Sequence, residues 1–460
     1  MSGKLANTKK AKGSIEMDLK IFLKKHGLTE GSLVDVSDGN EKYTGFIIPS
    51  NDDKLLVLKL KSGYNIGIAV ERIKDVKKLH EEKAVGKAEK NKIEHKPGLQ
   101  TIALLHTGGT IASRVDYKTG AVYATFNEED LLSMYPEITN KCNIVSKHIS
   151  NMWSDDMRFR HYQVIAENVE AMVKKGVKGV IIGHGTDTMA YSAAALAFML
   201  ENVQVPVLLV GAQRSSDRGS SDAAMNLDCA AEFILKTDFA GVAICMHNDS
   251  SDDKCAILPA CKTRKMHSSR RDAFRPINDT AIATVDYRTK EIKFLKKEYP
   301  RKDSSKKFRL MDKMEDRVAL LKITTNMFPE QFSFYAENKF KGVVIEGTGL
   351  GHTPGFVSDE HNKMHKKLWE AIEELSKKCV VVMTTQTLYG RLQMHVYDKG
   401  VELQKLGITP GGDMLPETAF VKLAWLLGNY NREEAKGLIG KNLRGEISER
   451  TSYEESFVPQ

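Results

Sequence analysis

Residues 101–113 read TIALLHTGGTIAS, and residues 179–192 read GVIIGHGTDTMAYS. In each stretch a short apolar run leads directly into a turn of glycine and threonine. Buried parallel strands have this composition, so both stretches predict the strand-to-turn junctions of an α/β domain. Threonine is β-branched, and a threonine fixed in such a turn presents its hydroxyl at a defined place. With Asp187 beside the second turn, the pattern indicates nucleophilic catalysis.

The strand-then-helix pattern continues on both sides of these turns. Apolar β runs occur at 101–105, 179–183, 205–211 and 241–246, with helical stretches such as 163–175 and 190–202 between them. This alternation predicts an α/β domain with a mainly parallel sheet, over about residues 99–300. A smaller α/β domain is predicted at 310–440, from β runs at 318–323, 342–345 and 380–383 and helices near 330–338, 361–377 and 415–427.

The N-terminal part of the chain has a different character. Residues 1–13 have a disordered composition, and Ser14 is positioned to cap a short helix that ends at Gly27. The apolar face of this helix comprises Ile15, Leu19, Phe22 and Leu23. The helix either docks on a partner or packs on its own domain. Close β runs at 33–36, 43–48, 55–60 and 64–73 predict a small antiparallel β-barrel of the SH3 or Tudor type, at 29–76.

Two charged segments join the predicted domains. Residues 77–98 contain few large apolar side chains and predict a solvated linker. Residues 296–310, KKEYPRKDSSKKFRL, predict a surface connection. The basic charge of the second segment also allows contact with RNA.

Composition narrows the class of protein. The chain has 460 residues, 68 basic and 60 acidic, so its net charge of +8 is modest for its length and does not argue for a nucleic-acid partner. The six cysteines form no CxxC pair, and no histidine cluster has zinc-ligand spacing, which predicts free thiols in a reducing cytoplasm and no metal site. Neither a signal peptide nor a membrane span is expected.

The first turn has specific chemistry. Ligands of α/β sheets collect at the carboxyl ends of strands, where Thr107 to Thr110 lie. The glycines allow left-handed backbone and expose N–H groups that can hold a negative oxygen. The spacing fits neither a P-loop nor a dinucleotide fingerprint. A purely structural tight turn is the alternative.

A threonine nucleophile needs a group that takes its proton. A carboxylate alone is a weak base for an alcohol, so a lysine is the better candidate. The segment KTRKMHSSRRDAF at 262–274 is rich in basic residues. A lysine there, if desolvated and near another cation, would have its pKa lowered from about 10.4. The alternative is an ordinary basic surface patch.

The motifs TGGTIAS and HGTDTM, with GGDMLPETA at 411–419, resemble the type I/II asparaginase family over about residues 99–430. That family hydrolyses a side-chain amide through an acyl-enzyme, on an α/β body of two domains. The resemblance implies Thr110 as nucleophile, Thr186 and Asp187 as the matching TD pair, and Lys265 as the catalytic lysine. It also implies that Ser154 and Asp155 bind the substrate's α-carboxylate and α-ammonium groups.

Three further points follow from the resemblance. A mobile lid tyrosine corresponds to Tyr117 or Tyr123, and Tyr117 in DYKTG is favoured because the glycine suits a hinge. Many free asparaginases have glutamine where Asp155 stands, so substrate preference can differ. Family members commonly form dimers in which the neighbouring subunit lends part of the site, so a homodimer is expected, although the lent residue is not identified.

The extra N-terminal barrel sharpens the resemblance. The order of the domains and the segments TGGTIASRVDYKTG and RKMHSSRRDAF resemble the D-subunit family of archaeal glutamyl-tRNA(Gln) amidotransferases. This implies that glutamine is hydrolysed and that a partner, the E subunit, uses ATP and Mg²⁺ to convert Glu-tRNA(Gln) to Gln-tRNA(Gln) with the ammonia. No cofactor is expected on this chain. The alternatives are a free-standing cytosolic asparaginase and a non-catalytic RNA-binding module.

Overall fold

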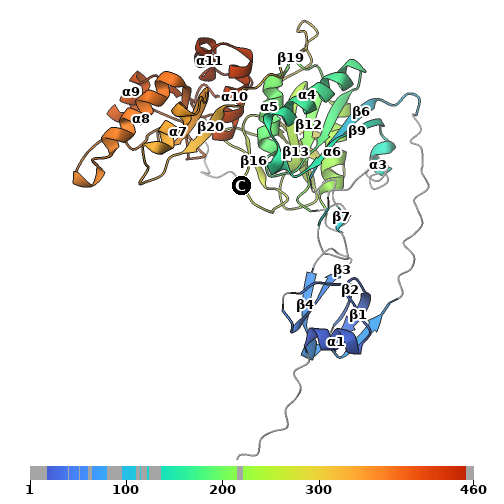
Figure 1. The fold of residues 1–460 in the computed structure, drawn as a ribbon. Helices are drawn as coiled ribbons and strands as arrows, with labels where there is room; N and C mark the ends of the chain where they lie inside the picture. Colours follow the sequence, from blue (N-terminus) through green and yellow to red (C-terminus); the bar gives the residue numbers. More distant parts are fainter. Residues whose placement is uncertain are drawn as a thin grey trace, which may run out of the picture. The chain divides into compact units, whose positions relative to one another are not determined.

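The computed structural model describes residues 18–39, 41–50, 52–60, 65–79, 96–109, 114–115, 122–123, 136–214 and 221–451. The chain divides into two compact units. The first consists mainly of the N-terminal 91 residues, and the second carries the α/β body. Each unit is coloured along the sequence in Figure 1.

The N-terminal unit is a five-stranded antiparallel sheet in the order β4-β3-β2-β1-β5. Its elements are α1 (Leu19–Lys25), β1 (Leu33–Ser37), β2 (Lys42–Ile48), β3 (Leu55–Leu60), β4 (Asn65–Ala69), η1 (Val70–Arg72) and β5 (Asp75–Lys78). The last two residues of β5, Lys77 and Lys78, belong to the segment 77–98 that was predicted to be a linker. Its pairing with β1 aligns Val36 with Val76, which adds an apolar residue to the sheet's core.

Helix α1 begins later than the sequence pattern predicts. Its N-cap is Asp18, whose carboxylate accepts the N–H of Lys20, whereas Ser14 and Ile15 lie outside the described residues. Leu19 and Phe22 are buried in the core of the antiparallel sheet. Of the two interpretations of this helix, the structure therefore favours packing on its own domain.

The larger domain of the body contains an eight-stranded sheet in the order β18-β17-β14-β13-β12-β10-β6-β9. The strands are β6 (Thr101–Gly108), β9 (Asn143–Met152), β10 (Gly179–Gly183), β12 (Pro206–Val210), β13 (Gly241–His247), β14 (Lys254–Pro259), β17 (Ala283–Asp286) and β18 (Ile292–Phe294). Five adjacent strands of the sheet are parallel, as expected: β13, β12, β10, β6 and β9. The other three strands, β14, β17 and β18, add an antiparallel extension that was not predicted.

Helices cover both faces of this sheet (Figure 1). Helices α4 (Phe159–Lys174) and α5 (Met189–Met199) pack on one face, and α3 (Pro136–Thr139) and α6 (Ala223–Lys236) pack on the other. Short pieces complete the domain: η3 (Ser154–Asp156), the pair β11 (Leu200–Glu201) and β19 (Arg309–Leu310), and the hairpin of β15 (Thr263–Lys265) and β16 (Phe274–Pro276). The hairpin of β7 (Arg114–Val115) and β8 (Val122–Tyr123) belongs instead to the N-terminal unit. The segment 296–310 thus ends in a strand rather than in a free connection.

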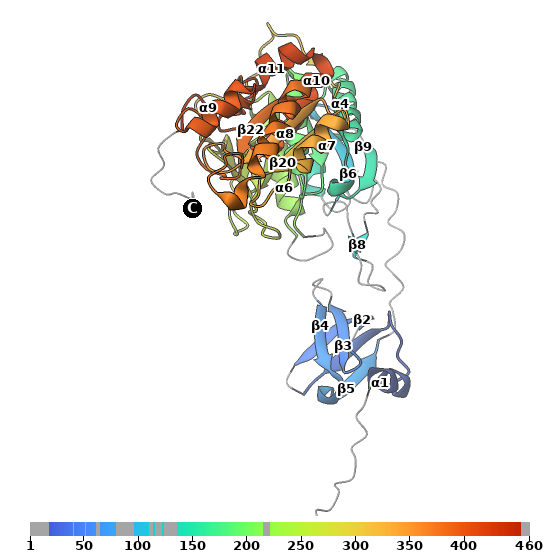
Figure 2. The ribbon, with the colours of Figure 1, turned by 60° about the vertical axis from the view of Figure 1, so that its left-hand side comes forward.

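The smaller domain is a four-stranded parallel sheet in the order β20-β21-β22-β23 (Figure 2). Its elements are β20 (Val318–Lys322), α7 (Glu330–Glu337), β21 (Gly342–Gly347), η4 (Glu360–Asn362), α8 (His365–Lys378), β22 (Val380–Thr385), α9 (Asp398–Lys405), β23 (Thr409–Pro410), α10 (Pro416–Asn429) and α11 (Arg432–Ile439). Helices α7 and α8 cover one face, and α10 and α11 cover the other.

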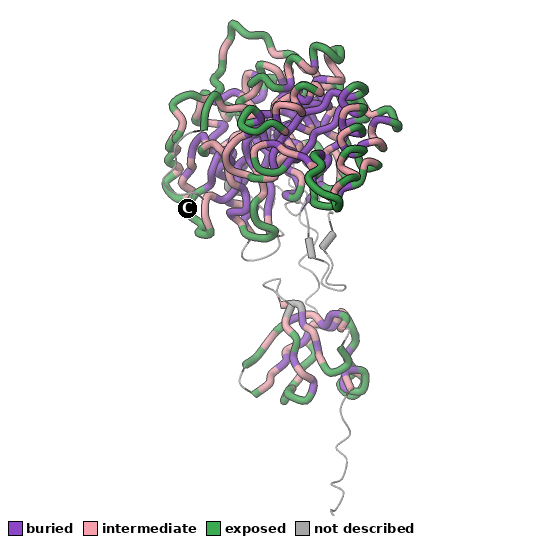
Figure 3. Tube along the Cα trace, turned by 90° about the vertical axis from the view of Figure 1, so that its left-hand side faces the viewer, coloured by how far each residue is buried: buried purple, intermediate pink, exposed green. Residues whose placement is uncertain are grey.

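A shared apolar core joins the two domains of the body. Helix α10 packs against α5, and the rings of Phe198 and Trp425 stack with centroids 5.5 Å apart. The buried residues concentrate in the interior of the body, with exposed residues on its outer loops (Figure 3). The expected two-domain α/β body with an antiparallel domain before it is confirmed. Among the described residues, no helix is long and apolar enough to cross a membrane.

Candidate active site

The two glycine-threonine turns lie against each other. Strands β6 and β10 are parallel neighbours, with His106 aligned to Gly183, so their carboxyl ends meet at one edge of the sheet. Gly109 has a φ of +81°, and a Cβ atom there would lie 2.5 Å from the Cα atom of Gly185. No real side chain fits in that space, so the close approach of the two turns requires glycine. Thr110, the expected nucleophile, lies outside the described residues.

The expected substrate-binding residues lie beside the second turn. Ser154 and Asp155 are in η3, which follows β9. A Cβ atom on Gly185 would lie 2.8 Å from the Cβ atom of Ser154. The hydroxyl of Thr188 donates to the Ser154 carbonyl at 2.6 Å, which ties η3 to the turn. Ser154 is buried and Asp155 is exposed, so the two side chains have different environments.

Lys265 joins the same turn from a distant part of the sequence. Its Nζ atom donates to Thr186 Oγ1 at 2.9 Å and to Asp187 Oδ1 at 2.7 Å. Lys265 is the last residue of β15, where it pairs with Phe274 of β16. Its side chain is 12% exposed, whereas that of Asp187 is 71% exposed. The three residues therefore connect the largely buried amine of Lys265 to the solvent-exposed carboxylate of Asp187.

The neighbour of Lys265 differs from the one that the sequence suggested. From the sequence, a lysine of this segment was considered with a second cation beside it, but the group in contact with Lys265 is the Asp187 carboxylate. In this arrangement the Lys265 amine donates to Thr186, so the hydrogen of the Thr186 hydroxyl can point to another acceptor.

His184 holds the turn through hydrogen bonds of its buried ring, a role that the sequence did not reveal. Its Nδ1 atom lies 2.6 Å from the Gly185 carbonyl oxygen, and its Nε2 atom lies 2.8 Å from Ser192 Oγ. A carbonyl oxygen only accepts, so Nδ1 carries the proton and Nε2 accepts from the serine. Burial lowers the pKa of His184 to about 4, so the ring is neutral near pH 7. The peptide that leads into Thr186 is thus held by a buried imidazole.

The segment 411–419 supports the strand that carries Lys265. Asp413 forms a buried ion pair with Lys262, with Oδ2 at 2.6 Å from Nζ. Glu417 lies 3.2 Å from Arg264, and the Thr418 hydroxyl donates to the Cys261 carbonyl at 2.9 Å. The smaller domain thereby fixes the residues just before Lys265.

The basic segment at 262–275 is neutralised by acidic partners rather than left as a positive patch. Its ion pairs are Lys262–Asp413, Arg264–Glu417, Lys265–Asp187, Arg270–Asp272, Arg271–Asp252 and Arg275–Asp272. Each lysine and arginine of the segment therefore has a carboxylate. The spacing of the sequence could not predict this, because most of the partners lie outside the segment.

Two expected features are not described by the structure. Tyr117 lies outside the described residues, and for Tyr123 the structure gives only its place in β8. The choice between them as the lid residue is therefore still a sequence-based expectation. Within the described ranges, no group of three or more histidine, cysteine or acidic side chains could hold a metal ion.

Comparisons with known proteins match all three parts of the chain. Residues 101–299 match the family Asparaginase, N-terminal, and residues 317–437 match the Glutaminase/Asparaginase C-terminal domain. Residues 28–79 match the GatD N-terminal domain, which includes β5 and ends one residue after it.

Relatives of one kind match nearly the whole length of the chain. The D subunit of the glutamyl-tRNA(Gln) amidotransferase of Pyrococcus abyssi is 45% identical over 444 residues, covering 94% of this chain and 98% of the relative. The protein of the same name from Methanococcus maripaludis strain C6 is 43% identical over 428 residues, covering 92% and 99%. With this coverage, both matches extend over the N-terminal unit as well as the body.

Among solved structures, the body is similar to asparaginases. The thermostable L-asparaginase from Thermococcus kodakarensis has a TM-score of 0.67 and 29% identity, covering 76% of this chain and 99% of that protein. L-asparaginase I from Vibrio cholerae has a TM-score of 0.65 and 26% identity, with the same coverage.

Proposed function

Because the chain belongs to the family of glutamyl-tRNA(Gln) amidotransferase D subunits, we propose that it is the glutamine-hydrolysing subunit of a tRNA-dependent amidotransferase. The observation that carries this proposal is the contact of Lys265 with both Thr186 and Asp187, beside the turn that leads to Thr110. A lysine, a hydroxyl and a carboxylate in direct contact form a path for protons.

The proposed reaction begins when the hydroxyl oxygen of Thr110 attacks the side-chain amide carbon of glutamine. The threonine proton passes to the trio of Thr186, Lys265 and Asp187, and then to the leaving nitrogen, which departs as ammonia. Water hydrolyses the acyl-enzyme and releases glutamate. Backbone N–H groups of the glycine turn stabilise the oxyanion, and one such donor is typically worth about 3 kcal/mol. Ser154 and Asp155 hold the substrate's α-carboxylate and α-ammonium groups.

The ammonia is proposed to pass to a partner. The E subunit would use ATP and Mg²⁺ to activate the glutamate on Glu-tRNA(Gln) and would accept the ammonia to form Gln-tRNA(Gln). The chain would work as a homodimer within a larger hetero-oligomer. It would do so in the cytoplasm, because free thiols persist in a reducing compartment, the chain has six of them, and the tRNA is found there. This chain would need no cofactor of its own.

The test separates hydrolysis from amidation. In the reconstituted complex, Thr110→Ala and Lys265→Ala should each lower glutamine hydrolysis at least about 10³-fold, because each removes a group that takes part in every turnover. Amidation of Glu-tRNA(Gln) with added ammonium chloride should persist. Lys293→Ala, an exposed lysine of β18, is the control and should leave both activities unchanged. Glutamine hydrolysis retained in either variant would exclude the role given to that residue.

A free-standing L-asparaginase is the second candidate, because the solved structures that match the body are asparaginases. The N-terminal unit argues against it, since the match to those structures covers 76% of this chain. The two candidates differ in a simple measurement. The purified chain alone should hydrolyse asparagine rapidly if it is an asparaginase, whereas the amidotransferase subunit should release ammonia from glutamine chiefly with its partner and charged tRNA present.

A further inference from the structure

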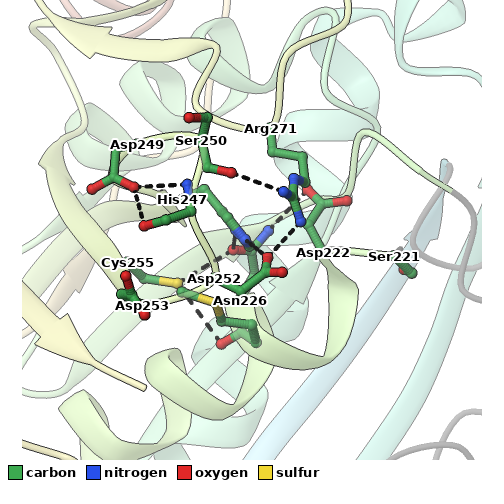
Figure 4. A network of polar contacts seen from close by, with 12 residues as sticks. Ser221, Asp222, Asn226, His247, Asp249, Ser250, Asp252, Asp253, Cys255 and Arg271 are labelled. Atoms are coloured by element: carbon green, nitrogen blue, oxygen red, sulfur yellow. Dashed lines mark hydrogen bonds and ion pairs between the residues drawn. The ribbon is translucent and has the colours of Figure 1, made fainter. Parts of the chain in front are cut away.

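A chain of polar contacts runs from the loop after Lys265 to the N-terminal end of α6 (Figure 4). Arg271 lies in the loop between β15 and β16, and its guanidinium pairs with Asp252 and donates to the Ser250 carbonyl at 2.8 Å. Asp252 in turn lies 3.3 Å from Nε2 of His247. Since Ser250 and Asp252 belong to the turn between β13 and β14, the catalytic hairpin rests on that turn.

The turn is itself anchored in the interior. His247 is fully buried, and its Nδ1 atom lies 2.7 Å from Oδ1 of Asn226. The amide nitrogen of Asn226 donates to the Gly211 carbonyl at 3.0 Å and to Asp222 at 3.3 Å, so its oxygen faces the histidine. Both ring nitrogens of His247 therefore face oxygen acceptors, one on Asn226 and one on Asp252.

Hydrogen bonds and ion pairs brace the loop of the hairpin that carries Lys265. The Met266 N–H donates to the Ala273 carbonyl at 2.6 Å, which closes the loop. Asp272 is buried and accepts from Arg270 at 2.8 Å and from Arg275 at 2.7 Å. Arg275 also donates to the Asn248 carbonyl, which gives the hairpin a second attachment to the β13–β14 turn. A braced loop fixed at two points transmits the position of that turn to Lys265.

We infer that Asp252, with His247 behind it, is a positioning residue that holds Lys265 against Thr186 and Asp187 through Arg271. This inference rests on the proposed function, because it assigns a purpose to the geometry of the same site. Within the described part of the chain, Asp252 contacts Arg271 and His247, so its connection to Lys265 runs through the loop of Arg271. Small displacements of a catalytic group are costly, since a misplacement of about 1 Å can lower the rate about 10²-fold.

The experiment uses the amidotransferase complex with Asp252→Asn, which keeps the side-chain shape and removes the charge. The glutaminase kcat should fall about 10- to 50-fold while KM stays within about twofold, because substrate is bound by other residues. Asp252→Glu should recover part of kcat. The double variant Asp252→Asn/Arg271→Gln should lose less activity than the product of the two single losses, since each change breaks the shared Arg271–Asp252 contact.

Asp253 provides a matched control. It lies in the same turn, but its partner is Arg288 at 3.7 Å, outside the chain of contacts. Asp253→Asn should leave kcat unchanged. If Asp252→Asn has no larger effect than Asp253→Asn, or if it changes KM rather than kcat, the positioning role is wrong.

Amide hydrogen exchange tests the positioning role of Asp252 without an activity assay. In Asp252→Asn, exchange should rise about tenfold or more in residues 262–276 and stay unchanged in α5, because the hairpin loses its Arg271–Asp252 anchor. Unchanged exchange in the hairpin would overturn the inference even if kcat fell. A wild-type complex without glutaminase activity would instead overturn the proposed function, and the exchange measurement would still decide whether Asp252 holds the hairpin.

Discussion

At the scale of single residues, the site depends on glycines, because their lack of a side chain lets neighbouring segments approach closely. The turn of Thr186 lies between Gly109 on one side and Ser154 on the other, and Gly185 leaves room for both. Thr186 accepts a hydrogen bond from Lys265, while Gly109 makes the close approach to Gly185.

Gly185→Ala tests this packing. The new methyl group would lie 2.8 Å from the Ser154 Cβ atom, which is closer than real contacts allow, so η3 or the turn must move. We expect glutaminase activity to fall about 10²-fold or more, because Thr186 and Ser154 would be displaced together. Steady-state assays of ammonia release check this result.

The control for this variant is Gly437→Ala in α11. A Cβ atom at Gly437 would meet no atom within 4 Å, and the helix interior favours alanine over glycine. Activity should be unchanged and the free energy of unfolding should rise by about 0.5–1 kcal/mol. Equal losses of activity in the two variants would argue against a specific role for the Gly185 contact.

At the scale of elements, the sequence predicted best those strands that are buried on both faces. The run at 179–183 matches β10, because a continuous apolar run has few other places to lie. The antiparallel strands β17 and β18 were missed because they are short and mix charged with apolar residues. The strand of Lys265 has only three residues, so family resemblance rather than periodicity pointed to it.

The contacts that hold this short strand also could not be read from the sequence. Asp413 and Lys262 are 151 positions apart, and only the packing of the two domains brings them together. Ion pairs of this kind have no local signal, because either residue alone has the pattern of an ordinary surface charge. The trio at the site was predictable by resemblance, whereas its supports at Asp413, Asp252 and His184 were not.

Asp413→Ala is the corresponding prediction for the elements. The change leaves the ammonium of Lys262 buried without its partner, and Asp413 also accepts the Ser448 N–H at 2.8 Å. We expect the free energy of unfolding to fall by about 3–5 kcal/mol, measured by denaturant titration. The double variant Lys262→Met/Asp413→Asn should recover most of this loss, because no charge remains buried and an acceptor for Ser448 is kept. A double variant as unstable as the single one would show that the buried charge is not the cause.

At the scale of the whole molecule, two buried histidines predict how stability depends on pH. Burial lowers the pKa of His184 to about 4, and burial together with the nearby His148 lowers the pKa of His106 to about 4. The ordinary value is 6.5, so the unfolded chain binds these protons at higher pH than the folded chain does. Stability from the neutral rings is therefore complete above pH 6.5 and is lost as pH falls toward 4.

The loss should amount to as much as about 3 kcal/mol for each ring by about pH 4. Carboxylates such as Asp272, whose pKa the Arg270 guanidinium lowers, titrate below this window and do not account for it. Among the described residues, neither ring nitrogen of buried His106 has a hydrogen-bond partner, so His106→Leu removes a group whose charging is costly and breaks no hydrogen bond. The variant should be at least as stable as the wild type near pH 7, and its unfolding midpoint should fall less between about pH 7 and about pH 4.5. His361→Leu, on the exposed η4, should behave as the wild type does. Should His106→Leu lose stability as steeply as the wild type, the acid sensitivity would have to come from groups other than this ring.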